Sequence, residues 1–300
     1  MILLFDIGNT NTHVGLADKK RVVRHTDIPT AAWLAGDAAK LLARFVGKAK
    51  PEGAAICSVV PRATPKVQSA ICSLWNLRAV ELTPKTVRGV GIDYPKPNSI
   101  GPDRLANAVA ARHHFGAPSV VVDFGTAVTF DVVDARGNYV GGIIAPGLAA
   151  MTEYLHEKTA LLPRIKIREV KSPVGKSTEH AMLVGAVHGY RGLVRELIGE
   201  LKRELKAKRL PVVATGGYAK LIASKLPEIS AVEPNLTLEG LRLVWRLQRS
   251  AAVSSSTGRS NIAAHGGVST IIISPKTTPH TCQGREAIRS GVKPTAQQVA

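Results

Sequence analysis

The stretch Leu3-Leu4-Phe5-Asp6-Ile7-Gly8-Asn9-Thr10 has a second copy later in the chain, Val121-Val122-Asp123-Phe124-Gly125-Thr126. Each copy is an apolar run that ends in Asp, followed by one residue, a glycine and hydroxyl-bearing residues. After each copy come a second apolar run, a polar turn and a third run. This pattern predicts strand, tight turn, strand, hairpin and strand, built twice.

A glycine and a carboxylate at a strand end suit a phosphate group or its metal ion. Glycine lets backbone N–H groups approach a phosphate, and Asp can position a cation. Two copies that face each other would enclose a nucleoside triphosphate between them, with Thr126 donating its hydroxyl hydrogen to a phosphate oxygen. One copy alone is also typical of an ordinary hairpin turn, so the recurrence carries the functional interpretation. Asp131 and Asp134, farther along the second hairpin, are interpreted as solvated turn residues.

The composition is that of a globular protein, with 45% hydrophobic and 21% charged residues. The 300 residues suit one large domain or two of ordinary size. A net charge of +18 fits anionic ligands or nucleic acid, although a generally basic proteome would give the same charge. The basic residues are dispersed and only 4% of residues are aromatic, so we do not expect nucleic acid as a partner.

We expect a cytoplasmic protein that does not cross a membrane. Asp6 interrupts the first apolar run, which argues against a signal peptide. No apolar stretch is long enough to span a bilayer. The cysteines, Cys57, Cys72 and Cys282, show no metal-pair spacing, and their odd number favours a reducing compartment.

Hydrophobic periodicity divides the chain into two α/β halves and an extension. We expect strands within 2–27, 54–59, 119–123 and 211–215, and helices over 30–47, 102–114, 147–157, 177–205, 218–224 and 236–248. Thr30 is expected to cap the first helix, and Pro61 to open a helix after 54–59. The predicted domains are 1–117 and 118–249. Residues 250–300 are predicted to be a low-complexity, disordered or foreign extension.

A second candidate site is Gly101-Pro102-Asp103-Arg104, at the start of a predicted helix. Asp is an ordinary stabilising residue at that position. In the functional interpretation, Asp103 takes a proton from a substrate alcohol while Arg104 holds an anion. The irregular loop before it, which contains Tyr94, suits the lip of a substrate site.

Two more segments have the composition of phosphate sites. Thr215-Gly216-Gly217 leads from a strand into a helix, where a flat ligand could press against the backbone; a plain strand–helix turn is the alternative. Gly175-Lys176-Ser177-Thr178 resembles the end of a Walker A loop, but Val170 stands where the earlier glycine is required. Ser177 or Thr178 is therefore expected to cap the next helix.

Together, the two Asp-x-Gly turns and the Gly-Gly turn resemble the actin, sugar kinase and Hsp70 ATPase superfamily. Within it, residues 1–248 resemble the type III pantothenate kinases. The resemblance is carried by Asp6-Ile7-Gly8-Asn9-Thr10, Ser58-Val59-Val60-Pro61, Tyr94, Gly101-Pro102-Asp103-Arg104, Asp123-Phe124-Gly125-Thr126-Ala127, Gly141-Gly142-Ile143-Ile144-Ala145-Pro146-Gly147, Thr178 and Leu236-Thr237-Leu238-Glu239-Gly240-Leu241. It implies an α/β fold of two ribonuclease H-like (actin-like ATPase) domains, each a mixed sheet flanked by helices.

The resemblance also implies an activity: ATP-dependent phosphorylation of the primary hydroxyl of pantothenate, the first step of coenzyme A biosynthesis. Members are homodimers that use Mg²⁺ with ATP and a monovalent cation, K⁺ or NH₄⁺. By resemblance, Asp103 would be the catalytic proton acceptor and Asp123 would bind the monovalent cation. The ATP-binding residues would be Asp6, Ile7, Gly8, Asn9, Thr10, Asn11, Thr12, His13 and Thr126. The pantothenate-binding residues would be Tyr94, Gly101, Pro102, Asp103, Arg104 and, near the dimer interface, Thr178.

Two other functions stay open at this point. Similar proteins have been described as transcription accessory factors, and the charge of +18 suits DNA. A DNA-associated factor of the same fold is therefore the alternative. A nucleotide-gated module of the Hsp70 type is less well supported, because the sequence shows no separate peptide-binding domain. Members of the kinase family usually end soon after the last predicted helix, so residues 250–300 would be a non-family extension.

Overall fold

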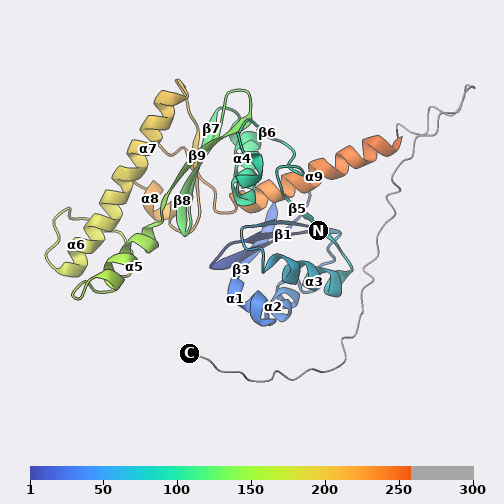
Figure 1. Cartoon of the computed structure of the whole chain (residues 1–300), viewed down its shortest axis with the longest axis horizontal. Coiled ribbons are helices and arrows are strands. Elements are labelled where there is room, and N and C mark those ends of the chain that lie inside the picture. Colours follow the sequence, from blue (N-terminus) through green and yellow to red (C-terminus); the bar gives the residue numbers. More distant parts are fainter. Residues whose placement is uncertain (258–300) are drawn as a thin grey trace, which may run out of the picture. The chain divides into compact units, whose positions relative to one another are not determined.

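The first copy of the motif begins a five-stranded sheet of order β3-β2-β1-β4-β5 (Figure 1). Its first three strands form an antiparallel meander, and β4 and β5 continue the sheet parallel to β1. The strands are β1 (Ile2–Ile7), β2 (Asn11–Ala17), β3 (Val22–Pro29), β4 (Gly53–Ser58) and β5 (Ala79–Glu81).

The second copy begins a sheet of order β11-β10-β7-β8-β9-β6 with the same pattern of strand directions, β6 being added at its edge. Ser119 pairs with Val133 as Ile2 pairs with Ala17, so the two hairpins share their register. The predicted duplication and the predicted mixed sheets are confirmed. The strands are β6 (Gly91–Ile92), β7 (Ser119–Phe124), β8 (Ala127–Val133), β9 (Asn138–Pro146), β10 (Val212–Thr215) and β11 (Ala231–Val232).

One face of the first sheet is covered by α1 (Thr30–Ala35), α2 (Ala38–Val46) and α3 (Thr64–Trp75). The single helix predicted over 30–47 is interrupted, because Gly36 adopts φ +95° and ends α1. Pro61 does not open α3, which begins at Thr64. Thr30 does not act as a cap through its side chain; it is buried and contacts the first turn instead.

Two helices, α4 (Pro102–Phe115) and α9 (Leu236–Thr257), pack together and against both sheets. On α4, Leu105 joins the core of the first sheet, while Ala110 packs with Val121 of the second. A Cβ atom on Gly240 would lie 2.0 Å from the carbonyl oxygen of Ala106, so this close helix contact requires glycine. The pair thus holds the two hairpins in a fixed relation.

The other face of the second sheet is covered mainly by α7 (Tyr190–Glu204) and α8 (Ala219–Ala223). The helix predicted over 177–205 consists of α6 (Thr178–Val184), a π-helical turn (Gly185–Gly189) and α7. The Ser177 hydroxyl accepts the backbone N–H of His180, which confirms the predicted cap. The remaining helices are α5 (Leu148–Lys158) and a 3₁₀ turn (Pro97–Ser99).

The computed structural model describes the backbone of residues 1–257 and the side chains of residues 1–250. Helix α9 continues to Thr257, beyond its predicted end at 248. The prediction for the rest of the extension, residues 258–300, lies outside the described residues. The described residues belong to one compact unit, and the division into domains at 117/118 stays a proposal. Among the helices that the structure describes, none combines the length and apolar character that a bilayer crossing requires.

Candidate functional site

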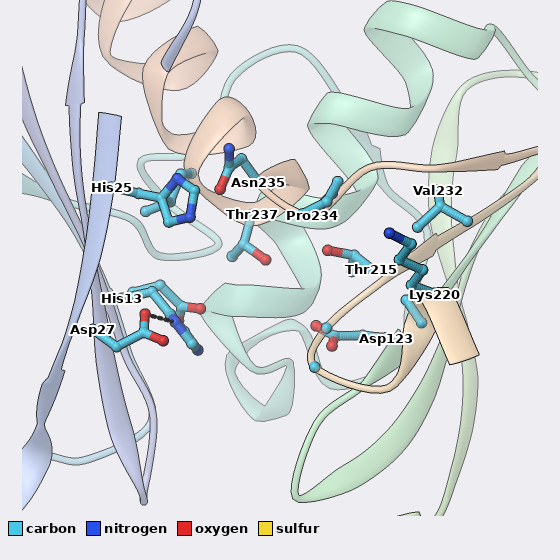
Figure 2. A pocket seen from close by; sticks show the side chains of 15 residues that line it. His13, His25, Asp27, Asp123, Thr215, Lys220, Val232, Pro234, Asn235 and Thr237 are labelled. Carbon is cyan, nitrogen blue, oxygen red and sulfur yellow. Dashed lines mark hydrogen bonds and ion pairs between the residues drawn. The ribbon is translucent and has the colours of Figure 1, made fainter. Parts of the chain in front are cut away.

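The two Asp-Gly turns open onto one cavity of about 350 Å³. Figure 2 shows His13 and Asp27, from β2 and β3, on one side and Asp123, Thr215 and Lys220 on the other. Residues at the start of α9 and the segment before it complete the lining. The cavity therefore lies where the equivalent ends of the two sheets face each other.

The tips of the two turns meet. The hydroxyl oxygens of Thr10 and Thr126 lie 3.5 Å apart, although 116 positions separate them in the chain. Both side chains are exposed, although neither belongs to the lining of the cavity, to which the turns contribute Asp6 and Asp123. The prediction that the two turns face each other is confirmed.

The first turn is closed by a hydrogen bond from the N–H of Gly8 to the carbonyl oxygen of Asn11 at 3.0 Å. The predicted ATP residues divide into two groups here. Asn9, Thr10 and His13 are exposed, whereas the side chains of Ile7 and Thr12 are fully buried. The buried pair can support the turn but offers a ligand only its backbone.

His13 lies beside the turn and forms a hydrogen bond with Asp27, Nδ1 to Oδ1, at 2.6 Å (Figure 2). The His13 side chain is 49% exposed, and the partial desolvation of its ring would by itself lower its pKa, but the carboxylates of Asp6 and Asp27 outweigh this effect and raise the pKa. A protonated His13 would place a positive charge next to the first turn, where a phosphate would be attracted.

Asp103 lies close enough to Asp6 and Asp123, the two aspartates that line the cavity beside the turns, to raise the pKa of both. Burial, reinforced by Asp103, raises the pKa of Asp6 to about 7 and that of Asp123 to about 6. Burial also raises the pKa of Asp103. The Cys57 thiol donates to Asp6 at 3.4 Å, and burial beside Asp6 keeps the pKa of this thiol high.

Carboxylates that repel one another in a buried site suit a cation, since a cation favours their charged forms. Among the described residues, however, no three His, Cys, Asp or Glu side chains form a group that could enclose a metal ion. This donor set fits Mg²⁺, which usually keeps waters and binds one or two carboxylates together with substrate phosphates. The same set of donors is equally compatible with a monovalent cation bound to Asp123.

Asp123 is held by a buried polar chain that sequence reasoning missed. The amide nitrogen of Asn107 donates to Asp123 at 3.1 Å, and the Thr237 hydroxyl donates to the amide oxygen of Asn107 at 2.8 Å. Thr237 therefore sets which end of the Asn107 amide faces Asp123. Asn107 lies on α4 and belongs to no motif that we identified. Thr237 lies on α9 within the Leu236–Leu241 segment of the resemblance, which gives no sign of this contact.

The Gly-Gly turn after β10 also lies on the cavity. Gly216 adopts φ +88°, and a Cβ there would lie 2.6 Å from Oδ1 of Asp123 and 2.7 Å from the backbone nitrogen of Phe124. Gly217 has open space around its Cα. The first glycine is thus required by the neighbouring carboxylate turn, and the second leaves room over the backbone.

A second group of side chains surrounds Arg104. Its Nε donates to Asp131 at 2.5 Å, its Nη2 donates to the carbonyl oxygen of Phe130, and its guanidinium lies over the ring of Tyr139. Tyr94 packs edge-on against Tyr139, with ring centroids 6.1 Å apart. Tyr94 and Arg104, which we predicted as substrate residues, therefore share one cluster at the start of α4.

The interpretation of Asp131 as a solvated turn residue is wrong. Asp131 lies inside β8 and is fully buried against Arg104, and burial raises its pKa to about 7. Alternation along β8 puts Asp131 on the face opposite Val128, Phe130 and Val132, and that face is buried only because α4 packs against it. Asp134, by contrast, accepts the N–H groups of Arg136 and Asn138 in the hairpin turn, as predicted.

Thr178 is not brought to this site within one chain. It begins α6, is exposed, and does not line the cavity. Gly101 and Pro102 directly precede Asp103 at the start of α4, and residues 101–104 likewise do not belong to the lining of the cavity.

Solved structures share the fold over most of this chain. A candidate Baf family transcriptional activator from Campylobacter jejuni has a TM-score of 0.52 at 18% identity, covering 83% of this chain and 99% of that one. A candidate 2-dehydro-3-deoxygalactonokinase from Sinorhizobium meliloti has a TM-score of 0.54 at 11% identity, covering 83% and 99%. At these identities the likeness concerns the fold alone.

Sequence comparison is more specific. Type III pantothenate kinase of Methylacidiphilum infernorum is 43% identical over 247 residues, which are 82% of this chain and 88% of the relative. Type III pantothenate kinase of Akkermansia muciniphila is 44% identical over 242 residues, or 80% and 96%. Residues 2–200 match the family described as type III pantothenate kinase. The chain therefore belongs to the type III pantothenate kinase family.

Proposed function

We propose that this protein transfers the γ-phosphoryl group of ATP to the primary hydroxyl of pantothenate, the first step of coenzyme A biosynthesis. The observation that carries the proposal is the contact between Thr10 and Thr126, which brings together the two turns whose aspartates, Asp6 and Asp123, line one cavity. Phosphoryl transfer depends on positioning and charge neutralisation more than on covalent chemistry. Facing turns with a carboxylate beside them suit both needs.

In this proposal the first turn holds the ATP phosphates. The backbone from Asp6 to His13 and the Thr126 hydroxyl bind them, and a charged His13 adds attraction. Mg²⁺, carried with ATP and held by Asp6, would neutralise phosphate charge. K⁺ or NH₄⁺ on Asp123 would offset the repulsion among the carboxylates. The Gly216-Gly217 turn borders the remaining cavity.

Asp103 is the proposed general base. Burial raises the pKa of Asp103, and a higher pKa makes a carboxylate a better proton acceptor near neutral pH. Asp103 takes the proton of the pantothenate primary hydroxyl as its oxygen attacks the γ-phosphorus. Arg104 binds the carboxylate of pantothenate, with Tyr94, Gly101 and Pro102 shaping the surrounding surface.

We propose that the enzyme acts as a homodimer. Large apolar side chains are exposed on and around α5, with Tyr154 60% and Leu161 89% accessible, and Ile144 and Val174 each 65% accessible. Thr178 is exposed at the start of the following helix. A second copy covering this surface would bury the apolar side chains and could bring Thr178 to the partner's substrate.

Sedimentation of purified protein tests this interface. Tyr154→Glu should shift the protein from dimer to monomer. The matched control Val23→Glu, at a half-exposed position on β3, should leave it dimeric. A monomeric wild-type protein at micromolar concentration would contradict the proposed dimer.

Enzyme turnover tests the function. Purified protein with ATP, Mg²⁺ and K⁺ should release ADP only when pantothenate is added, and mass spectrometry should find phosphopantothenate. ADP release that ignores pantothenate would contradict the proposal. The DNA-associated alternative is not favoured by the relatives, and a missing mobility shift with DNA at low salt would count further against it. A cytoplasmic location, where ATP is present, remains part of the proposal.

A further inference from the structure

Asp131 is a carboxylate in the interior of a β-sheet. It lies in the middle of β8, its side chain is 0% exposed, and one of its oxygens lies 2.5 Å from Nε of Arg104. Its other oxygen is buried and has no hydrogen-bond partner in the described part of the chain. Burying a charge in this way costs free energy, so a carboxylate at this position suggests a specific role.

The surroundings of Asp131 fix the guanidinium of Arg104 on several sides. Nε is held by Asp131, Nη2 by the carbonyl oxygen of Phe130 at 3.1 Å, and the Tyr139 ring lies 5.7 Å from Cζ. A Cβ on Gly142 would lie 2.7 Å from Nη2, so that glycine leaves room for the group. These contacts define the plane of the guanidinium.

The contacts leave one end of Arg104 available. Within residues 1–250, no acceptor is found for Nη1, and the side chain is still 14% exposed. Arg104 directly follows Asp103, the proposed base. A guanidinium that is locked at Nε and Nη2 can present Nη1 to a ligand in one direction only.

The Asp131–Arg104 ion pair has two possible roles, to stabilise the fold or to orient the guanidinium, and these make different predictions. A buried ion pair adds little stability compared with apolar residues of similar volume, so stability alone does not account for it. A fixed guanidinium, however, loses little conformational freedom when it binds an anion, and hydrogen bonds between charged groups are strong. The position beside the proposed base favours the second explanation.

We propose that Asp131 is a positioning residue that orients Arg104 toward the carboxylate of the substrate, and so selects an acidic substrate over a neutral one. This inference rests on the proposed function. Asp131 is fully buried and does not touch the substrate; it acts through Arg104. The preference for an acidic substrate then depends on the buried contact between β8 and α4 as well as on the exposed residues of the substrate site.

The test compares two substitutions and two substrates. Asp131→Leu removes the acceptor for Nε, while Asp131→Asn keeps an oxygen that can accept it. The substrates are pantothenate and pantothenol, which carries an alcohol in place of the carboxylate. We expect Asp131→Leu to raise KM for pantothenate roughly 10–100-fold, the range for one hydrogen bond between charged groups. KM for ATP and kcat/KM for pantothenol should change less than about twofold.

Asp131→Asn should recover most of the affinity for pantothenate. In an Arg104→Gln background, adding Asp131→Leu should cause no further loss, because the residue through which Asp131 acts is already gone. This double variant also removes both charges together, which guards against failure to fold. A merely structural role would lower activity toward both substrates and raise KM for ATP as well.

The outcomes separate this inference from the proposed function. If wild-type protein does not phosphorylate pantothenate, the proposed function fails. If it does, but Asp131→Leu leaves the preference for pantothenate over pantothenol unchanged, only the role of Asp131 fails. A lower KM for pantothenate in Asp131→Leu would also overturn it, since Asp131 would then act by neutralising Arg104.

Discussion

Thr30 donates its hydroxyl hydrogen to the carbonyl oxygen of Gly8 at 2.6 Å, and its backbone N–H to the carbonyl oxygen of Thr10 at 3.0 Å. The same hydroxyl lies 3.1 Å from that of Thr12, and Thr30 is 2% exposed. One buried residue at the start of α1 thus holds two carbonyl groups of the first turn. Carbonyl oxygens held in this way are kept from a phosphate that they would repel.

Replacing Thr30 should therefore weaken ATP binding. Thr30→Val keeps the shape but removes the hydroxyl, and we expect KM for ATP to rise about 3–10-fold, as for one neutral hydrogen bond. KM for pantothenate should not change. Thr30→Ser should behave like the wild type, and Thr26→Val on β3 serves as a control. Equal KM values for ATP in Thr30→Val and wild type would remove Thr30 from the turn's function.

Asp103→Asn tests the proposed base directly. The amide cannot accept the proton of the attacking hydroxyl, so kcat should fall by roughly 10²–10⁴-fold. The variant should fold normally, because Asn can replace Asp near a helix N-terminus at little cost. Steady-state kinetics and a thermal melt measure both effects. A near-normal kcat would show that another group removes the proton.

The pH dependence of kcat should also report the role of Asp103 as the base. Because the pKa of Asp103 is raised, protonation should inactivate the enzyme at a higher pH than for an ordinary carboxyl group. Saturating Mg²⁺ and ATP should hold Asp6 and Asp123 in their charged forms. The acidic limb of kcat then reports mainly Asp103, and the residual activity of Asp103→Asn should lack this limb.

Asp123 should reduce stability when no cation is bound. Its pKa is about 6 in the folded protein, against 3.8 for an ordinary Asp. Between these values the folded state holds a proton that the unfolded state has released, so stability falls as pH rises through this window. Above about pH 6 the full loss is present, and below about pH 4 it vanishes.

Asp123→Asn should accordingly be more stable than wild type at pH 8, by roughly 3 kcal/mol, and equally stable near pH 4. Urea denaturation at both pH values in a buffer free of K⁺ and Mg²⁺ measures the difference. Adding K⁺ should stabilise the wild type more than the variant. A variant that is less stable at pH 8 would mean that the Asn107 hydrogen bond outweighs the burial of the charge.

Local patterns were enough for the hairpins and for the facing turns. Asp6 and Asp123 end strands of matching register, and a repeat of that length predicts matching structure. The supports of the site were not predictable in this way. Thr30, Asn107 and Thr237 act through contacts between distant segments, which no sequence spacing encodes. Asp131 was misassigned because a carboxylate near a hairpin is usually solvated, and only packing against Arg104 makes its burial tolerable.

The two adjacent glycines after β10 offer the sharpest matched pair. A methyl group on Gly216 would press on Asp123 and on the backbone nitrogen of Phe124, and the φ of +88° is itself unfavourable for alanine. Gly216→Ala should therefore lower stability by about 1–3 kcal/mol and weaken ATP binding. Gly217→Ala meets nothing within 4 Å and has ordinary φ, so its stability should stay within about 0.5 kcal/mol of wild type.

Thermal melts without ligand and titration calorimetry with ATP measure the two effects separately. If Gly217→Ala keeps its stability but loses ATP affinity, the ligand lies directly over that backbone, because the added methyl group touches nothing else. If both variants melt and bind like the wild type, Gly216 does not shape the turn that contains Asp123 and Phe124. Contact between the Gly-Gly turn and Asp123 would then not determine where the cavity lies.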